Sequence, residues 1–478
     1  MRGRARASGG SGSRPAQAAA PGRARGAPGR QRAERRQLGP PAVPAGRPLE
    51  LHRPRAARPD PPPQLHPPDI PRHDPRGWFR GRRDRRHLSH PGAARWPPER
   101  GGPRRGAGAA RAARLPAPRA GTARGQLAVG ARRVPLVSVV VVCWNAKQHL
   151  PICLASLRRL TYPNVEVLAV DNGSTDGTRE YIESEHSWVR VHSLDHNAGY
   201  AAANNAGFAA ASGQYLVVLN PDTEVEPEFV TALVEAADQD GIGLATSRIC
   251  FFDDRERVNT CGNDIHMSGL GFCRGLGRPA ALFEKCERVA AVSGCAFIIR
   301  RDVLETVGGF DDDYFTYTED SDLSLRASIA GYGIVYAPRS IVYHKYALRM
   351  SPRKFYFLER NRRLTLLKNF RWGTLIALLP PVWMTGFLMW VYAISHGTEY
   401  VRAKLQAHGW IYSNWGLVLE KRRRTQALRK VGDREVIRLL SSDLPPDQVI
   451  GPGLLSRLGG IPLNLAYRLL AVPVRLFG

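Results

Sequence analysis

The amino-terminal part of the chain lacks lysine entirely and has few aliphatic or aromatic residues. Residues 1–133 contain 31 arginines and 7 acidic residues, which gives a net charge of 31 − 7 = +24. The whole chain carries +27, so residues 134–478 carry only 27 − 24 = +3. A segment this poor in apolar residues cannot bury enough surface to offset the entropy of ordering, so we expect residues 1–132 to be disordered.

Two further interpretations of this arginine-rich tail stay open. It is an arm that binds RNA or a membrane surface through its charge, or a translation of GC-rich DNA upstream of the true start codon. The tail has no RGG-type repeat and no interleaved aromatic residues, so we expect no nucleic-acid partner. No apolar segment follows Met1, so the sequence does not predict a signal peptide there.

Cysteine pairs with metal-binding spacing are also absent. All seven cysteines follow residue 134, their number is odd, and no two of them form a CxxC pair. Free thiols in a reducing cytosol are the simplest explanation of this pattern.

From residue 134 onward the sequence alternates between two hydrophobic patterns. Nearly unbroken β-branched runs are typical of strands buried on both faces, and apolar residues three or four positions apart are typical of helices. Strands are predicted at 134–145, 165–170, 189–194 and 214–220, and helices at 150–160, 176–183 and 199–213. This alternation predicts an α/β fold, an open and mostly parallel sheet with helices on both faces. Ligands of such sheets bind beyond the carboxyl ends of the strands.

The middle of the chain, about residues 240–300, is harder to interpret. Further buried strands are predicted within 289–301 and 331–338, and a basic helix at 351–370. We therefore predict one α/β domain over residues 133–371.

The remaining residues, 372–478, are predicted to form a helical region that associates with a membrane. Residues 372–398 contain no aspartate, glutamate, lysine or arginine, and the apolar segment at about 374–394 is long enough to span a bilayer. Pro380 and Pro381 would kink a helix, so the segment is expected to lie in the interface or to re-enter. A buried core helix is the alternative.

Acidic residues stand at three places where chemistry is expected. Asp171 ends a strand, and it either binds a nucleotide or closes a turn through its own backbone. Asp222 follows a strand and Pro221, and it either binds Mg²⁺ or Mn²⁺ that carries a diphosphate or caps the next helix. Six acids and four aromatic residues lie within 310–322. One of these carboxylates can serve as a general base beside an apolar wall, or the acids complement a helix dipole.

Two basic features also have a functional and a structural explanation. His344 follows a strand-like run, and it is either a structural histidine or a second ligand of the metal ion on Asp222. The basic helix includes Arg353, Lys354 and Arg360, which either hold phosphate or form a solvated face near anionic lipid.

The order of these motifs resembles inverting glycosyltransferase family 2, which has the GT-A (Rossmann-like) fold. The resemblance rests on a buried first strand followed by DNGSTDGT, HNAGYAAANNAG, LNPDT, TEDSDLSLR, VYH and FLERNRR. The last two motifs are similar to the rhamnosyltransferase-like branch, which builds bacterial surface polysaccharides. The resemblance covers about residues 134–371, half of the chain.

The resemblance implies a role for each residue that matches a motif. Asp320 would be the catalytic base, and Asp222 and His344 would bind a divalent metal ion, Mg²⁺ or Mn²⁺. Asn220 stands where many members have the first acid of Asp-x-Asp. The residues implied to bind the nucleotide are Asp171, Asn197, Gly199 and Asn205. Supporting roles are expected for Asn220, Glu319, Asp322, Arg326 and Arg360.

The activity implied is inverting transfer of a sugar from a nucleoside-diphosphate sugar to a hydroxyl of a lipid-linked or glycan acceptor in cell-surface polysaccharide synthesis. The favoured donor is dTDP-rhamnose, and the alternative is a UDP-sugar that carries galactofuranose or an N-acetylhexosamine. The expected partners are this donor, a polyprenyl-linked or glycan acceptor and a membrane surface, and the expected location is the cytoplasmic face of the bacterial inner membrane. Outside enzymes, the alternative is a nucleic-acid-binding protein that acts through its arginine-rich tail.

Overall fold

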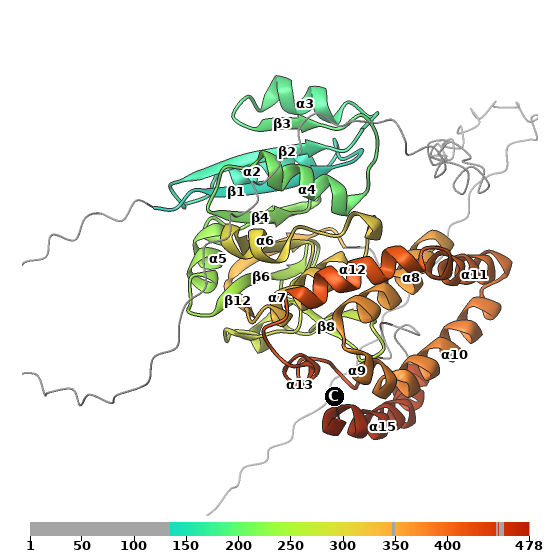
Figure 1. The fold of residues 1–478 in the computed structure, drawn as a ribbon. Coiled ribbons are helices and arrows are strands. Elements are labelled where there is room, and N and C mark those ends of the chain that lie inside the picture. The colour runs from blue at the N-terminus through green and yellow to red at the C-terminus, as the bar shows by residue number, and fades with distance from the viewer. Residues whose placement is uncertain (1–133, 347–348, 446–447, 449–453, 478) are drawn as a thin grey trace, which may run out of the picture. The chain divides into compact units, whose positions relative to one another are not determined.

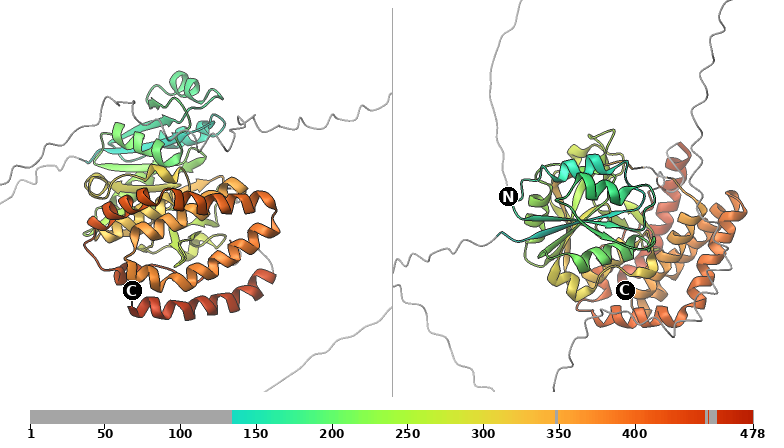
Figure 2. Two further views of the ribbon diagram at one scale, coloured as in Figure 1. Left: turned by 45° about the vertical axis from the view of Figure 1, so that its right-hand side comes forward. Right: turned by 90° about the horizontal axis from the view of Figure 1, so that it is seen from above.

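A twisted sheet with helices on both faces forms the first part of the described chain (Figures 1 and 2). The computed structural model describes residues 134–346, 349–445, 448 and 454–477. The strands of the sheet are β1 (Val137–Cys143), β2 (Val165–Asp171), β3 (Arg190–Ser193), β4 (Tyr215–Leu219), β5 (Thr223–Val225), β6 (Ile242–Phe251), β7 (Val258–Thr260), β10 (Glu287–Arg288), β11 (Ala296–Arg300) and β12 (Gly333–His344). Their order is β10-β12-β6-β11-β4-β1-β2-β3, with β5 paired to β12 and β7 paired to β6.

The sheet is mixed, so the prediction of a mostly parallel sheet is only partly right. β3, β2, β1 and β4 are parallel neighbours, and β6 pairs with β12 in parallel. β11 runs antiparallel to both β4 and β6, because the chain returns from the end of β6 without a crossover helix. That return includes the hairpin of β8 (Asn263–Ile265) and β9 (Gly271–Cys273). Unbroken apolar runs mark buried strands but carry no information on direction.

Helices cover the sheet on both faces, as the sequence predicts. Alternate residues of β1 point to opposite sides, and every residue of this strand is buried. α2 (Leu150–Leu157), α3 (Thr178–Glu185) and α5 (Phe229–Ala237) pack on the face that holds Val139 and Val141. α4 (Tyr200–Ala210), α6 (Arg301–Val307) and α7 (Glu319–Ile329) pack on the face that holds Val140 and Val142. The two layers bury the strands and leave the strand ends free for ligands.

A group of helices follows the sheet in the chain and packs beside it (Figure 1). They are α8 (Pro352–Asn369), α9 (Trp372–Ala377), α10 (Leu379–Ser395), α11 (Thr398–Ser413), α12 (Trp415–Ala427), α13 (Asp433–Ile437) and α15 (Leu454–Phe477). Two short 3-10 helices, η1 (Ala280–Leu282) and η2 (Asp312–Tyr314), occur earlier in the chain. α8 confirms the predicted basic helix. α11 and α12 pack against it. α10 and α15 lie side by side, joined by a hydrogen bond of 2.6 Å between the hydroxyls of Thr385 and Tyr467.

The predicted apolar segment at 374–394 is divided between two helices. α9 ends at Ala377, and its C-cap Leu378 is also the N-cap of α10. Pro380 occupies the first turn of α10, where a proline is tolerated. Within the described part of the chain, no helix is both long and apolar enough to cross a membrane. The segment is also not a buried core helix, because side chains such as Trp383 and Phe387 are exposed.

Candidate functional site

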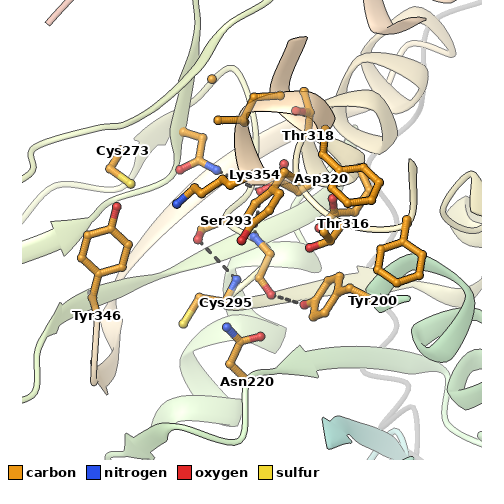
Figure 3. A pocket seen from close by; sticks show the side chains of 18 of the residues that line it. Tyr200, Asn220, Cys273, Ser293, Cys295, Thr316, Thr318, Asp320, Tyr346 and Lys354 are labelled. Atoms are coloured by element: carbon orange, nitrogen blue, oxygen red, sulfur yellow. Dashed lines mark hydrogen bonds between the residues drawn. The ribbon is translucent and has the colours of Figure 1, made fainter. Parts of the chain in front are cut away.

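A pocket of about 800 Å³ opens beyond the carboxyl ends of β1, β2 and β4, where the sheet topology predicts a ligand site (Figure 3). Residues after the strands line one side, among them Asn145, Asn172 and Asp222. The start of α7 and the first half of α8 line the other side, and α10 contributes Met389 and Tyr392. A volume of this size suits a nucleotide-sized ligand together with part of a second substrate.

The structure brings Asp222 and His344 together, although they are far apart in the sequence. Asp222 directly precedes β5, and β5 pairs with the end of β12 in a register that sets Thr223 opposite His344. As a result, the His344 Nε2 atom lies 3.4 Å from Asp222 Oδ1. The other ring nitrogen, Nδ1, lies 2.9 Å from Asn259 Oδ1, which fixes the orientation of the ring.

This pair has the donor atoms of a weak divalent-metal site. Burial works against the charge on Asp222, but His344 lowers the pKa of this carboxyl below its ordinary value. Burial also disfavours the charged form of His344, yet Cys295 and Asp222 raise its pKa to about 10. Among the described residues, no cluster of three His, Cys, Asp or Glu side chains could hold a metal ion.

Asp222 supplies a carboxylate oxygen of the kind that Mg²⁺ or Mn²⁺ takes, and His344 can add its Nε2 atom only when metal binding displaces the proton from the ring. Phosphate oxygens and water would complete the shell of such an ion. Two buried polar atoms nearby, His149 Nδ1 and Asn259 Nδ2, have no hydrogen-bond partner among the described residues. Asn220 lines the same part of the pocket, and its backbone N–H donates to Cys295 O at 2.9 Å. Asp222 and His344 fit the predicted divalent metal ion. Asn220 has a neutral side chain and adds no negative charge to the site.

Asp320 faces the pocket and is held by four hydrogen bonds. Its Oδ2 accepts from Asn263 Nδ2 at 3.0 Å and from the Gly294 N–H at 2.9 Å. Its Oδ1 accepts from the N–H of Ser321 at 2.7 Å and from its hydroxyl at 3.3 Å. Burial raises the pKa of Asp320, and these hydrogen bonds oppose that rise because they favour the ionised form.

The neighbouring Glu319 is in the opposite situation. Its side chain is buried, and its Oε2 atom has no hydrogen-bond partner among the described residues. Burial, together with the charge of Asp320, raises the pKa of Glu319 to about 8. Of the two carboxyls, Asp320 is the one whose ionised form accepts hydrogen bonds from several donors, so it ionises more readily than Glu319.

A strained loop precedes these two acids. Phe315, Tyr317 and Thr318 all have positive φ angles, 62°, 67° and 70°, which L-residues rarely adopt. Asn361 of α8 holds this loop, because its Nδ2 atom donates to the carbonyl oxygens that surround the strained residues. The neighbouring Arg360 is also buried and donates to Tyr314 O at 2.9 Å. The guanidinium of Arg360 is thus occupied by the loop, and Arg360 is not among the residues that line the pocket.

The residues predicted to bind the nucleotide divide into two groups. Asn197 and Gly199 line the pocket, and Asn197 Oδ1 accepts from the Gly199 N–H at 2.9 Å. Gly199 has a φ of 90°, and a Cβ there would lie 2.6 Å from the Phe315 ring, so a side chain has no room. Asp171 does not line the pocket; its Oδ1 accepts from the Ser174 N–H at 3.2 Å, the turn interaction that was the alternative.

Three other predicted residues have structural contacts away from the pocket lining. Asn205 Nδ2 donates to Asp312 Oδ1 at 2.7 Å and joins α4 to the acid-rich loop. Asp322 and Arg326 are buried and form an ion pair of 2.9 Å within α7. Lys368 of α8 also pairs with Asp322, at 2.9 Å, so this group ties α7 to α8 beneath the site.

Sequence reasoning missed several polar residues that line the pocket. Asn172 Oδ1 accepts from the Ala198 N–H at 2.9 Å, and thus connects the end of β2 to the start of α4. The position of Asn172 directly after the predicted strand was the available signal, but the nucleotide-binding role was assigned to the adjacent Asp171. Asn259, Asn263 and His149 come from segments with no pattern that indicates a site.

Comparisons with known proteins agree with this geometry. Residues 138–308 match the model of the family described as Glycosyl transferase family 2. The N-acetylglucosaminyl-diphospho-decaprenol L-rhamnosyltransferase of Mycobacterium tuberculosis is 32% identical over 232 residues, 44% of this chain and 76% of that protein. The O-antigen biosynthesis protein RfbC of Myxococcus xanthus is 31% identical over 229 residues, 45% of this chain and 18% of that protein.

The chain therefore belongs to glycosyl transferase family 2, and it is a glycosyltransferase. Among solved structures, residues 1–349 of S. aureus TarS in complex with UDP-GlcNAc match with a TM-score of 0.43 and 18% identity. That match covers 70% of this chain and 92% of the TarS chain.

Proposed function

We propose that the protein transfers a sugar, with inversion at the anomeric carbon, from a nucleoside-diphosphate sugar to a hydroxyl of a lipid-linked or glycan acceptor. The observation that carries this proposal is the position of Asp320, a hydrogen-bonded carboxyl group that shares one pocket with Asp222 and His344. A base and a diphosphate-binding pair on opposite sides of one cavity are what an in-line displacement at a sugar carbon requires.

Asp320 is the proposed general base. It takes the proton from the acceptor hydroxyl, and the oxygen then attacks the anomeric carbon from the face opposite the leaving diphosphate. The pKa of Asp320 is raised by burial, which makes the carboxylate a better proton acceptor. The raised pKa of Glu319 beside it favours the negative charge of the pair on Asp320, where the proton must go.

Asp222 and His344 are the proposed residues that hold a divalent ion, Mg²⁺ or Mn²⁺. When bound, such an ion neutralises the charge that develops on the departing diphosphate. Asn172, Asn197 and Gly199 would position the nucleotide, because they line the pocket beside the strand ends. The backbone can approach a ligand closely at Gly199, which has no side chain to intervene.

The favoured donor is dTDP-rhamnose, with a UDP-sugar of galactofuranose or an N-acetylhexosamine as the second candidate. The mycobacterial relative is named as an L-rhamnosyltransferase that acts on an N-acetylglucosaminyl-diphospho-decaprenol, and this supports both rhamnose and a lipid-linked acceptor. A lipid-linked acceptor places the reaction at a membrane surface, and we propose the cytoplasmic face of the bacterial inner membrane. The product would enter a cell-surface polysaccharide.

The test measures nucleoside-diphosphate release by the full chain in detergent with Mg²⁺ or Mn²⁺. A panel of dTDP- and UDP-sugars is tried with and without polyprenyl-diphosphate acceptors. Release from one donor identifies the sugar, and Asp320→Asn should abolish release while nucleotide binding stays near the wild-type value. Full activity in Asp320→Asn would remove Asp320 from the role of base. No release and no nucleotide binding across the panel would overturn the proposal.

A further inference from the structure

The far end of the pocket, away from Asp222, contains two cations without carboxylate partners. Arg353 and Lys354, in the first turn of α8, both line the pocket. Among the described residues, neither forms an ion pair. Arg353 lies over the rings of Phe315 and Phe357, at 5.4 and 5.9 Å from their centroids. Lys354 Nζ lies 5.0 Å from the centroid of the Tyr317 ring.

Three buried cations of this region differ from these two. Lys368, Lys404 and Arg362 each contact a buried carboxylate, at distances between 2.5 and 2.9 Å. Burial lowers the pKa of Lys354, which has no acid beside it to counter this effect. Arg353 is exposed and Lys354 is half-buried, and a cation that lines a cavity without an internal counter-ion is free to pair with an anion from outside.

Next to these cations the pocket becomes apolar. Phe355 and Leu358 of α8 line it together with Met389 and Tyr392 of α10, and the rings of Phe355 and Tyr392 stack at 5.6 Å. Figure 3 shows Lys354 pointing into the cavity, in the same view as Asp320. The lining thus passes from two cations to apolar side chains, which matches a ligand that has an anionic group beside an apolar chain.

The apolar wall continues outside the pocket. Tyr392 lines the cavity from one side of α10, and Trp383, Phe387 and Ile394 project from the same helix with 75%, 67% and 68% of their surface exposed. α15 lies beside α10 and adds further exposed side chains. They are Ile461, Leu465, Leu469 and Val472. An exposed apolar surface of two neighbouring helices is unusual for a protein that meets only water.

We propose that Arg353, Lys354 and the α8–α10 wall form the acceptor subsite, which binds the diphosphate and the first isoprenoid units of a lipid diphosphate. The inference rests on the proposed function and names its acceptor as a sugar linked to an isoprenoid diphosphate, in which the sugar supplies the attacking hydroxyl. The cations hold the diphosphate on the side of Asp320 where the hydroxyl must enter. The chain leaves along α10 toward its exposed face, which contacts the lipid bilayer.

The experiment measures binding of farnesyl diphosphate to the full chain in detergent, with farnesol and inorganic diphosphate as comparison probes. Wild type should bind farnesyl diphosphate more tightly than either probe. Arg353→Ala with Lys354→Ala should weaken this binding by about tenfold or more, since two charge-assisted contacts are lost. Lys354→Met, which keeps the apolar stem, separates the loss of charge from any loss of packing. Arg402→Ala, an exposed arginine on α11, is the matched control and should bind as wild type does.

Two outcomes would overturn the inference. One is equal binding by the double variant and the Arg402→Ala control. The other is binding that requires a divalent ion and disappears in Asp222→Asn, because the probe would then occupy the donor site. Binding of dTDP or UDP in the same assay separates the two proposals. If no nucleotide binds, the proposed function fails, and if nucleotide binds but farnesyl diphosphate does not, only the acceptor subsite fails.

Discussion

Replacing Asn361 by alanine is expected to slow catalysis by releasing the strained loop in front of Asp320. The Asn361 Nδ2 atom lies 3.1, 3.0 and 2.7 Å from the carbonyl oxygens of Tyr314, Thr316 and Tyr317. Asn361 itself is fully buried, so water cannot replace its amide at these contacts. The loop ends at the first turn of α7, which carries Asp320, so its conformation sets the position of the base.

The free energies of strain and clamping are comparable. Each non-glycine residue in the left-handed region costs about 1–2 kcal/mol, so Phe315, Tyr317 and Thr318 together cost about 3–6 kcal/mol. The two N–H groups of the Asn361 amide contribute about 1–3 kcal/mol in net hydrogen bonding. The hydrogen bond from Arg360 Nε to Asn361 Oδ1, 2.9 Å long, adds about 1.5–3 kcal/mol because it is charge-assisted. Without the clamp, the loop is expected to relax toward negative φ.

Urea unfolding and steady-state kinetics measure the two consequences. Asn361→Ala should lose about 3 kcal/mol of unfolding free energy through the missing hydrogen bonds. The value of kcat should fall about 100-fold, since a displacement of about 1 Å at a catalytic group has this effect. Nucleotide affinity should stay near the wild-type value, because Asn361 does not line the pocket.

Asn369→Ala is the matched control for Asn361→Ala. Asn369 is also a fully buried asparagine of α8, but its Nδ2 atom donates to Asp322 and Thr365 instead of the loop. It should lose stability with a much smaller effect on kcat. Thr318→Gly relieves part of the strain, so adding it to Asn361→Ala should restore part of kcat. The reasoning is refuted if both asparagine variants lose stability equally and keep equal kcat.

Three further predictions concern the acids of the site. The pKa of Glu319 is raised by burial and by Asp320 from 4.5 to about 8 in the folded protein, so stability should fall as pH rises between these two values; Glu319→Gln should flatten that slope in urea unfolding at several pH values within this range, and an unchanged slope would contradict the assignment. Asn263→Ala removes a hydrogen bond that favours ionised Asp320, so the acid limb of kcat/KM should move to higher pH, and a downward shift would contradict the geometry. Asp222→Asn should raise the Mg²⁺ or Mn²⁺ concentration for half-maximal activity by about tenfold, measured by metal titration after chelation.

The sequence alone predicts those helices and strands that are marked by a local pattern of apolar or basic residues. β1, β2 and β4 are buried runs of apolar residues, and α8 is a basic segment with helical spacing, so each was predicted close to its observed bounds. The direction of β11 was not predictable, because pairing partners distant in the sequence decide whether a strand runs parallel or antiparallel. The division of the segment 374–394 followed from its prolines, but the exposure of its outer face depends on which helices pack beneath it.

The candidate site was predictable only where a motif fixed a position. Asp320 and Asp222 were assigned through motifs, and both line the pocket. Arg360 could not be assigned from its charge, because a buried arginine that holds backbone carbonyls and an exposed one that holds phosphate look the same in a sequence. Asn361 follows it directly and was not singled out, since an asparagine in a helix gives no sign of what lies opposite until the fold is known.

α8 connects the proposed steps of the reaction. Its first turn carries Lys354 at the acceptor end of the pocket, and two turns later Asn361 holds the loop of the base. Between them, buried Glu359 accepts from Arg362 at 2.6 Å and pairs with Lys404 of α11, so the helix is fixed by charges that cannot be separated cheaply in an apolar interior. A rigid helix with both groups keeps the acceptor subsite and the base in one frame.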